Sequence, residues 1–251
     1  MRINNNLMAI NTHGQMGKTT VNMGKTMEKL SSGLRINRGA DDAAGLAISE
    51  KMRGQIRGLK QAQRNAQDGV SFVQTAEGTY NEVSNMLVRM KELGVQRANG
   101  TYSASDQANI DSELTALKAE IDGVLSNTKF NGTAITASIS IAVDDAATAV
   151  TITASSYTAS TGTTLAQVEA DITSVSTQRA NYGAMQNRLE SRVKSLGTTA
   201  ENLQASESRI RDTDMAQEMM TFTKNNILLQ ASQAMLSQAN QAPQGALQLL
   251  R

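Results

Sequence analysis

Few residues in this 251-residue chain are of the types that catalysis or metal binding requires. His13 is the single histidine, and there is no cysteine. A His-based triad, a multi-His metal site and thiol chemistry are therefore excluded within one chain. The His-Glu-x-x-His pattern of zinc proteases is absent too. We expect no enzyme, no cofactor and no catalytic residue, with His13 a polar position on a helix.

Two adjacent carboxylates, Asp41 and Asp42, follow two arginines, Arg35 and Arg38. Such a group offers oxygen ligands to a metal or guanidinium groups to a phosphate. Two neighbouring carboxylates alone seldom form a metal site. The favoured interpretation is a joint between two regions, where the aspartates cap the following helix and pair with the arginines. No metal is expected there.

A long helical pattern begins directly after these residues. Apolar and small residues recur in alternating steps of three and four, which is the spacing of a heptad seam. The seam comprises Leu59, Ala62, Ala66, Gly69, Val73, Ala76, Tyr80, Val83, Leu87 and Met90. The one proline is Pro243, so no proline interrupts a helix from about Asp42 to Asn99.

Two shorter helical patterns and an alternating segment follow. A second helix is predicted to begin at Ser105 or Asp106 and to end near residues 129–132, where turn-forming residues gather. A third, on the same three–four spacing, is predicted from Leu165 to Ile210. Between them, alternation at Ile139, Ile141 and Val143 and at Val150 and Ile152 predicts a β-hairpin. The fold class is therefore mainly α: a long antiparallel helical bundle or coiled coil with a small β-hairpin region.

Residues 133–164, which contain the hairpin, are rich in hydroxyl groups. Fourteen of these 32 residues are Ser or Thr. Such a segment suits O-linked sugars and equally suits an unmodified solvated loop, and both interpretations stay open.

The two ends of the chain carry apolar residues on more than one helical face, which one partner helix cannot cover. A membrane surface or a larger assembly could cover them. Lys224 is the only basic residue between Arg211 and Arg251, which disfavours an anionic membrane. We expect the ends to pair with each other and to become ordered on assembly. The expected packing residues are Leu7, Ile10, Met23, Met27, Leu30, Leu34, Met215, Met219, Phe222, Ile227, Leu229 and Leu236.

Net charge and the first residues bear on partners and location. A net charge of +1 gives no bulk attraction to nucleic acid. No apolar run is long enough for a membrane span, so no membrane insertion is expected. The start MRINNNLMAIN lacks the apolar core of a secretory signal, which on its own would indicate a cytosolic protein.

Two segments resemble the signatures of bacterial flagellins. Residues 31–48, SSGLRINRGADDAAGLAI, resemble the N-terminal signature. Residues 209–216 (RIRDTDMA), 240–244 (NQAPQ) and 249–251 (LLR) resemble the C-terminal one. The similarity covers residues 1–132 and 165–251, and the short middle resembles a form without the outer variable domains.

The resemblance implies a structural subunit that polymerises into the bacterial flagellar filament for swimming motility. It implies export in an unfolded state by the flagellar type III apparatus, and hence a secreted protein in an extracellular filament. Residues 1–40 and 205–251 would be terminal helices paired in the filament core. Residues 41–204 would be a rod domain with three helices and a hairpin at about 133–164. A hook–filament junction protein is the alternative.

The same resemblance implies partners. They are further copies in a helical homopolymer, an export chaperone on the C-terminal segment, and the filament cap and hook-junction proteins. Residues 87–96 resemble the flagellin stretch recognised by the animal innate immune receptor TLR5, which implies roles for Arg89 and Leu93 with Glu113 on the next helix. The same face would also form contacts between neighbouring subunits, and the two roles are compatible.

Overall fold

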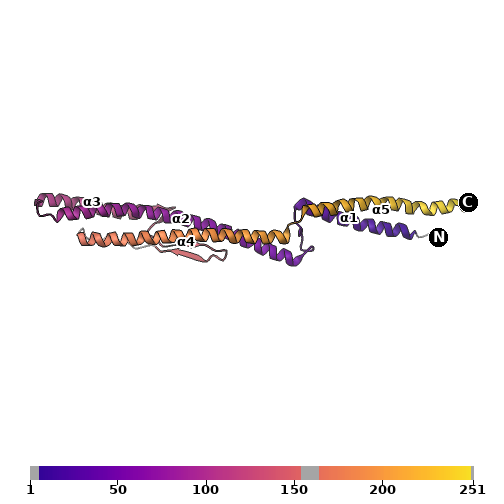
Figure 1. The fold of residues 1–251 in the computed structure, drawn as a ribbon, viewed down its shortest axis with the longest axis horizontal. Coiled ribbons are helices and arrows are strands. Elements are labelled where there is room, and N and C mark those ends of the chain that lie inside the picture. Colours follow the sequence, from indigo (N-terminus) through magenta and orange to yellow (C-terminus); the bar gives the residue numbers. More distant parts are fainter. Residues whose placement is uncertain (1–5, 154–163, 250–251) are drawn as a thin grey trace. The chain divides into compact units, whose positions relative to one another are not determined.

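The computed structural model describes residues 6–153 and 164–249, and these form five helices and two small antiparallel strand pairs (Figure 1). The helices are α1 (Leu7–Ser32), α2 (Ala43–Arg97), α3 (Ala104–Asn127), α4 (Leu165–Arg211) and α5 (Met215–Leu249). The strands are β1 (Lys129–Phe130), β2 (Thr133–Ala134), β3 (Ile139–Ala142) and β4 (Ala149–Ile152). The mainly helical fold with a small hairpin region is confirmed.

Two compact units divide the chain. One comprises residues 1–53 and 203–251 and contains α1 and α5, while the other comprises residues 54–202. In the second unit, α2, α3 and α4 share one hydrophobic core with the strands. In the first unit, α1 and α5 pack along each other, as expected for the two ends.

The predicted seam of the long helix is the centre of that core. All ten predicted seam residues from Leu59 to Met90 are buried, and Leu93 continues the series. Glycine at position 69 has a packing reason, because a Cβ there would overlap the side chain of Ile141 on β3. The three–four spacing therefore identified the core face of α2 correctly.

Local signals explain where the helices begin and end. Asp42 Oδ1 accepts a hydrogen bond from Gly45 N at 2.8 Å, which caps α2 as expected. The start of α3 differs from the prediction: Ser103, rather than Ser105 or Asp106, is the N-cap, and Asp106 completes a capping box from the N3 position. Helix α1 ends at Gly33, whose positive φ of 71° is the usual left-handed glycine stop.

The strands form two hairpins, only one of which was predicted. In the predicted one, Ile139 pairs with Ile152 and Ile141 pairs with Val150. The other joins β1 to β2 through Asn131 and Gly132, whose φ angles are 48° and 81°. An Asn-Gly pair between short β-prone segments is the sequence signal of such a turn. The predicted role of residues 129–132, the end of a helix, therefore covers only part of what they do.

Candidate self-assembly site

The pairing of α1 with α5 uses a narrow and partly polar seam. On each helix the buried and half-buried residues recur in steps of three and four. On α1 they are Ala9, Thr12, Met16, Thr19, Met23, Thr26 and Leu30. On α5 they are Glu218, Phe222, Asn225, Leu229, Ser232, Leu236 and Ala239. Threonine, serine and asparagine alternate with the apolar residues, so the two helices bury little apolar surface against each other.

Most large apolar residues of α1 and α5 lie outside this seam and face solvent. Leu7, Ile10 and Ile227 are about 60% exposed. Among the residues up to 241, the other exposed ones on these two helices are Met8, Val21, Met27, Met215, Met219, Met220, Leu228 and Met235. A shallow groove on α5, of about 530 Å³, is lined by six residues from Met219 to Leu228. Exposed apolar surface of this extent marks a surface that another molecule covers.

The twelve residues predicted to pack in an assembly divide between these two surfaces. Six lie on the α1–α5 seam or close to it and are half-buried: Met23, Leu30, Leu34, Phe222, Leu229 and Leu236. Six are exposed: Leu7, Ile10, Met27, Met215, Met219 and Ile227. The helices thus present apolar residues on more than one face, as the pattern indicated. The seam threonines Thr19 and Thr26 were missed, because a hydrophobic pattern gives no weight to a hydroxyl residue.

A short backbone ladder closes the joint next to the terminal helices. Leu34 and Asp212 form an isolated antiparallel bridge, in which Arg35 N donates to Arg211 O at 2.6 Å and Thr213 N to Gly33 O at 3.0 Å. Arg211 also reaches α2, where it pairs with Glu50 at 2.6 Å. That ion pair, which the sequence analysis missed, lowers the pKa of Glu50. Residues 175 positions apart in sequence are therefore joined here.

The predicted pairing of Asp41 and Asp42 with the arginines is wrong. Arg38 Nε donates to Glu28 at 2.9 Å, and Arg35 donates to the carbonyl oxygen of Ile210. Asp41 instead accepts from the backbone N–H groups of Arg38 and Asn37, which lowers the pKa of its carboxyl group. These backbone donors occupy one oxygen that a metal would need.

The predicted receptor face is placed only in part. Arg89 on α2 and Glu113 on α3 are both partly exposed and form an ion pair at 3.0 Å, and Arg89 also pairs with Glu92 at 3.2 Å. Leu93 was expected on the same surface, but it is only 2% exposed and belongs to the bundle core. It occupies the next seam position of α2, three residues after Met90, which explains its burial.

The described part of the chain shows no arrangement for metal chemistry or for crossing a membrane. No group of three or more His, Cys, Asp or Glu side chains among the described residues is placed to hold a metal ion. In the same residues, no helix combines the length and apolar character that a membrane span needs. Two buried tyrosines, Tyr80 and Tyr182, pack with ring centres 5.5 Å apart, and burial raises the pKa of both, so both hydroxyls stay neutral. Their place is the bundle core, not a catalytic cleft.

Comparison with known proteins agrees with this architecture along the whole chain. Residues 3–140 match the bacterial flagellin N-terminal helical region, and residues 165–250 match the bacterial flagellin C-terminal helical region. The chain is 51% identical to a flagellin of Halalkalibacterium halodurans and 46% identical to a flagellin of Bacillus subtilis, each over 100% of both chains. It is 45% identical, again over 100% of both chains, to the flagellar filament 33 kDa core protein of Treponema phagedenis.

Among solved structures, the crystal structure of Bacillus cereus flagellin is similar at 29% identity, with a TM-score of 0.41, over 56% of this chain and 88% of that one. The two regional matches together include most of the chain, and the relatives align over their full length. The chain belongs to the bacterial flagellin family.

Proposed function

We propose that this chain is the structural subunit of a bacterial flagellar filament, secreted and assembled outside the cell, and that its terminal helices carry the polymerisation. Flagellins are structural proteins and not enzymes. The supporting observation is the apolar surface that α1 and α5 leave uncovered after pairing with each other. Nothing in the comparisons favours the hook–filament junction protein.

In this proposal the chain has three functional regions. Residues 1–40 and 205–251 line the filament core, and residues 41–204 form the surrounding rod. The multi-sided apolar character of α1 and α5 supports this division, because each helix needs further neighbours beyond its partner. Contacts between two different surfaces of successive copies, repeated by a rotation that does not close, produce a helical filament.

Export and assembly partners complete the proposal. The subunit passes through the flagellar type III apparatus unfolded, an export chaperone holds the apolar C-terminal segment beforehand, and cap and hook-junction proteins meet it at the filament. The exposed apolar residues of α5 support the chaperone, because such a surface aggregates when it is left free.

Released monomer is recognised by TLR5 through Arg89 and Glu113, whose exposed ion pair supports this role. For the Ser/Thr-rich segment, residues 133–164, O-linked sugars and an unmodified loop stay the two alternatives. Residues 154–163 of this segment lie outside the described part of the chain.

The experiment removes exposed apolar groups without touching the α1–α5 seam. Ile10→Ser with Ile227→Ser is compared with a matched control, Gln230→Ser, at an exposed polar position of α5. Sedimentation and electron microscopy should show filaments for the control and soluble monomer for the double variant, at equal helicity by circular dichroism. Deletion of residues 1–35 and 215–251 should likewise abolish filaments and leave a helical rod. A truncated chain that still polymerised would contradict the proposal.

A further inference from the structure

The seam between α1 and α5 repeats itself every seven residues on both helices. On α1 the apolar positions are Ala9, Met16, Met23 and Leu30, and the polar ones are Thr12, Thr19 and Thr26. On α5 the apolar positions are Phe222, Leu229 and Leu236, and the polar ones are Glu218, Asn225 and Ser232. A movement of α1 along α5 by one heptad, about 10.5 Å, therefore brings each kind of layer opposite the same kind again.

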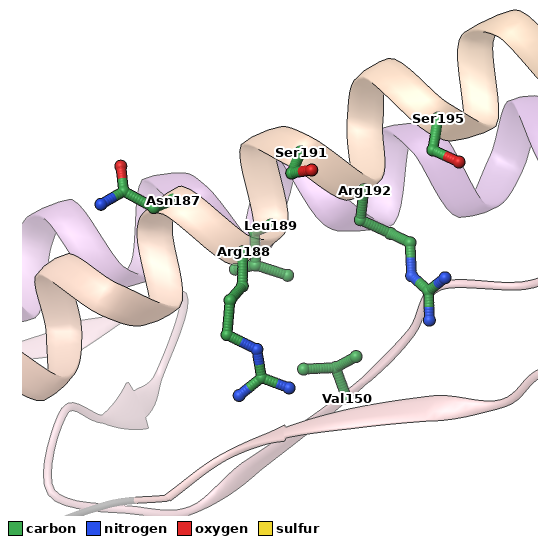
Figure 2. Close-up of a pocket in the computed structure, with 7 residues that line it drawn as sticks. All are labelled: Val150, Asn187, Arg188, Leu189, Ser191, Arg192 and Ser195. Atoms are coloured by element: carbon green, nitrogen blue, oxygen red, sulfur yellow. The ribbon is translucent and has the colours of Figure 1, made fainter.

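The rod unit differs, because it contains layers that occur once and fix the register of its helices. Tyr80 of α2 packs on Tyr182 of α4 with ring centres 5.5 Å apart. Farther along α4, Val150 of the hairpin lies between the guanidinium groups of Arg188 and Arg192 (Figure 2). Movement of α4 by one heptad would separate both contacts. In the α1–α5 seam, where threonine recurs at each polar position of α1, the same movement exchanges like for like.

Two contacts at opposite ends of the pair define the register of α1 and α5 in the structure. Asn6 Nδ2 donates to Ala239 O at 2.6 Å at one end, and Leu34 bridges Asp212 at the other. Between these contacts the two helices run in opposite directions over nearly the same number of residues (Figure 1). The facing layers are then Met23 with Phe222, Thr19 with Asn225, Met16 with Leu229 and Ala9 with Leu236.

The seam itself gives no reason to prefer this register over one in which α1 lies one heptad farther from the joint. In that second register Met16 would replace Ala9 opposite Leu236, which buries a larger side chain. The other two apolar layers would exchange methionine for methionine or leucine. Glu218, which is half-buried in the seam, would lie past the end of α1, and its carboxylate would regain water.

The joint supplies the specification that the seam lacks. Arg35 N donates to Arg211 O at 2.6 Å, and Thr213 N donates to Gly33 O at 3.0 Å. Ile36 is 2% exposed, so the chain is anchored again directly after this ladder. These contacts begin at the residue that follows the last residue of α1. While they hold, α1 has no free chain with which to move along α5.

We propose that the joint, and not the seam, sets the register of the terminal helices, and that α1 takes the second register when it is released from the joint. The consequence for assembly rests on the proposed function. The exposed apolar residues of the two helices, such as Ile10 and Ile227, keep their relative height only in the register that the joint imposes. A shift of about 10.5 Å would misplace them for contact with a neighbouring copy. The joint residues are therefore positioning residues for polymerisation.

Engineered disulfides report the register directly, because the chain contains no cysteine. Asn225→Cys is combined in turn with Thr12→Cys, Thr19→Cys and Thr26→Cys, which are equivalent positions of three successive heptads. A disulfide needs Cα atoms within about 7 Å, so a shift of one heptad moves the bond from one threonine position to the next. The measurement is the initial rate of intramolecular disulfide formation in the full-length chain, with circular dichroism as the check of helicity.

An insertion releases α1 without altering the joint or the seam. Seven Gly and Ser residues are placed between Ser32 and Gly33, where the first inserted glycine can end the helix. The same seven residues between Gly100 and Thr101, in the exposed turn between α2 and α3, form the matched control. Each of the three cysteine pairs is measured in the original chain, the released chain and the control.

We expect T19C/N225C to form fastest in the original chain and in the control. In the released chain T26C/N225C should become the fastest pair, with its rate relative to T19C/N225C raised at least about tenfold. If T19C/N225C stays fastest after release, the seam sets the register and the inference is overturned. Equal rates for the three pairs after release would also overturn it, because the helices would then have no preferred second register.

Elongation of short filament seeds tests the consequence for assembly. Release should raise the critical concentration for elongation about tenfold, equivalent to ~1.4 kcal/mol. Oxidation of T19C/N225C in the released chain should restore it to within about twofold of the control, whereas oxidation of T26C/N225C should not. Impaired chains that the T19C/N225C bond fails to rescue would overturn the positioning role. Failure of the original chain to elongate would overturn the proposed function, while the disulfide rates would still decide the register.

Discussion

Leu93 permits the sharpest separation of folding from recognition, because the resemblance and the structure give it different roles. As a surface contact, its truncation would leave the stability of the rod unchanged. As a core residue that is 2% exposed, it should behave like other fully buried leucines. Leu93→Ala then removes buried methyl groups and leaves a cavity, at a cost of about 2–5 kcal/mol in the free energy of unfolding.

That cost translates into a measurable shift of the melting temperature. For a unit of 150–250 residues, each kcal/mol lowers the unfolding midpoint by roughly 2–4 °C. Leu93→Ala should therefore lower the midpoint by about 4–20 °C in a thermal scan followed by circular dichroism. Leu93→Met is the matched control, because it conserves volume and should cost less than about 1.5 kcal/mol. Arg89→Ala removes exposed ion pairs and should change stability by no more than about 1 kcal/mol.

Receptor signalling by the same monomers completes the test. Arg89→Ala should weaken TLR5 signalling across a dose series at unchanged stability. Leu93→Ala should weaken it only together with the loss of stability, and Leu93→Met should restore both. A Leu93→Ala variant that melts at the same temperature as wild type but loses TLR5 signalling would refute the reasoning, because the leucine side chain would then act at the surface. Unchanged signalling by Arg89→Ala would remove the receptor role of this face.

Three further predictions concern the N-cap of α3, the contact between Gly58 and the hairpin turn, and the stability of the fold at low pH. Ser103→Ala should lower the free energy of unfolding by about 1 kcal/mol, whereas Ser105→Ala should have little effect, as measured by urea unfolding. Gly58→Ala should cost about 1–3 kcal/mol, because its Cβ would lie 3.2 Å from the Asp145 Cα and displace the hairpin turn, while Gly54→Ala has open space and should stabilise α2. Stability should be constant above about pH 5 and fall in more acid solution, because carboxyl groups with lowered pKa values stabilise the fold only while ionised. Those groups are the carboxyl groups of Asp41, Glu50 and Asp106. Their ordinary pKa values are 3.8 for the two aspartates and 4.5 for the glutamate. A melting temperature independent of pH down to pH 2 would contradict the last of these.

The alternating three–four spacing predicted the helical core because the same spacing recurs many times along one helix. The seam from Leu59 to Met90 contains ten positions without a slip, so no single residue had to be interpreted correctly. The hairpin at Ile139–Ile152 was predictable for a similar reason, since alternation is seen on both strands. The β1–β2 turn rests on one Asn-Gly pair and was missed, although that pair carries the signal.

The joint was less predictable, because its partners are distant in sequence. The residues Arg35, Arg38, Asp41 and Asp42 lie within eight positions of the sequence, so pairing among them was the local interpretation. In the structure Arg35 reaches Ile210, and Arg38 reaches Glu28 on the preceding helix. Nothing in one sequence indicates which carbonyl oxygen a guanidinium group will contact across 175 residues. The exposed or buried state of Leu93 was decidable, since the seam spacing extends to it.

The methionines on the outer faces of the terminal helices have a mechanical consequence. Met8, Met27, Met215, Met219, Met220 and Met235 are all exposed there. A thioether chain has three rotatable bonds and no branch, so it changes rotamer at low cost and fills gaps of varying shape. Adjacent copies joined through such side chains are able to slide by small amounts and stay in van der Waals contact. In the proposed filament, a core wall built from these contacts would bend under hydrodynamic load without opening a seam.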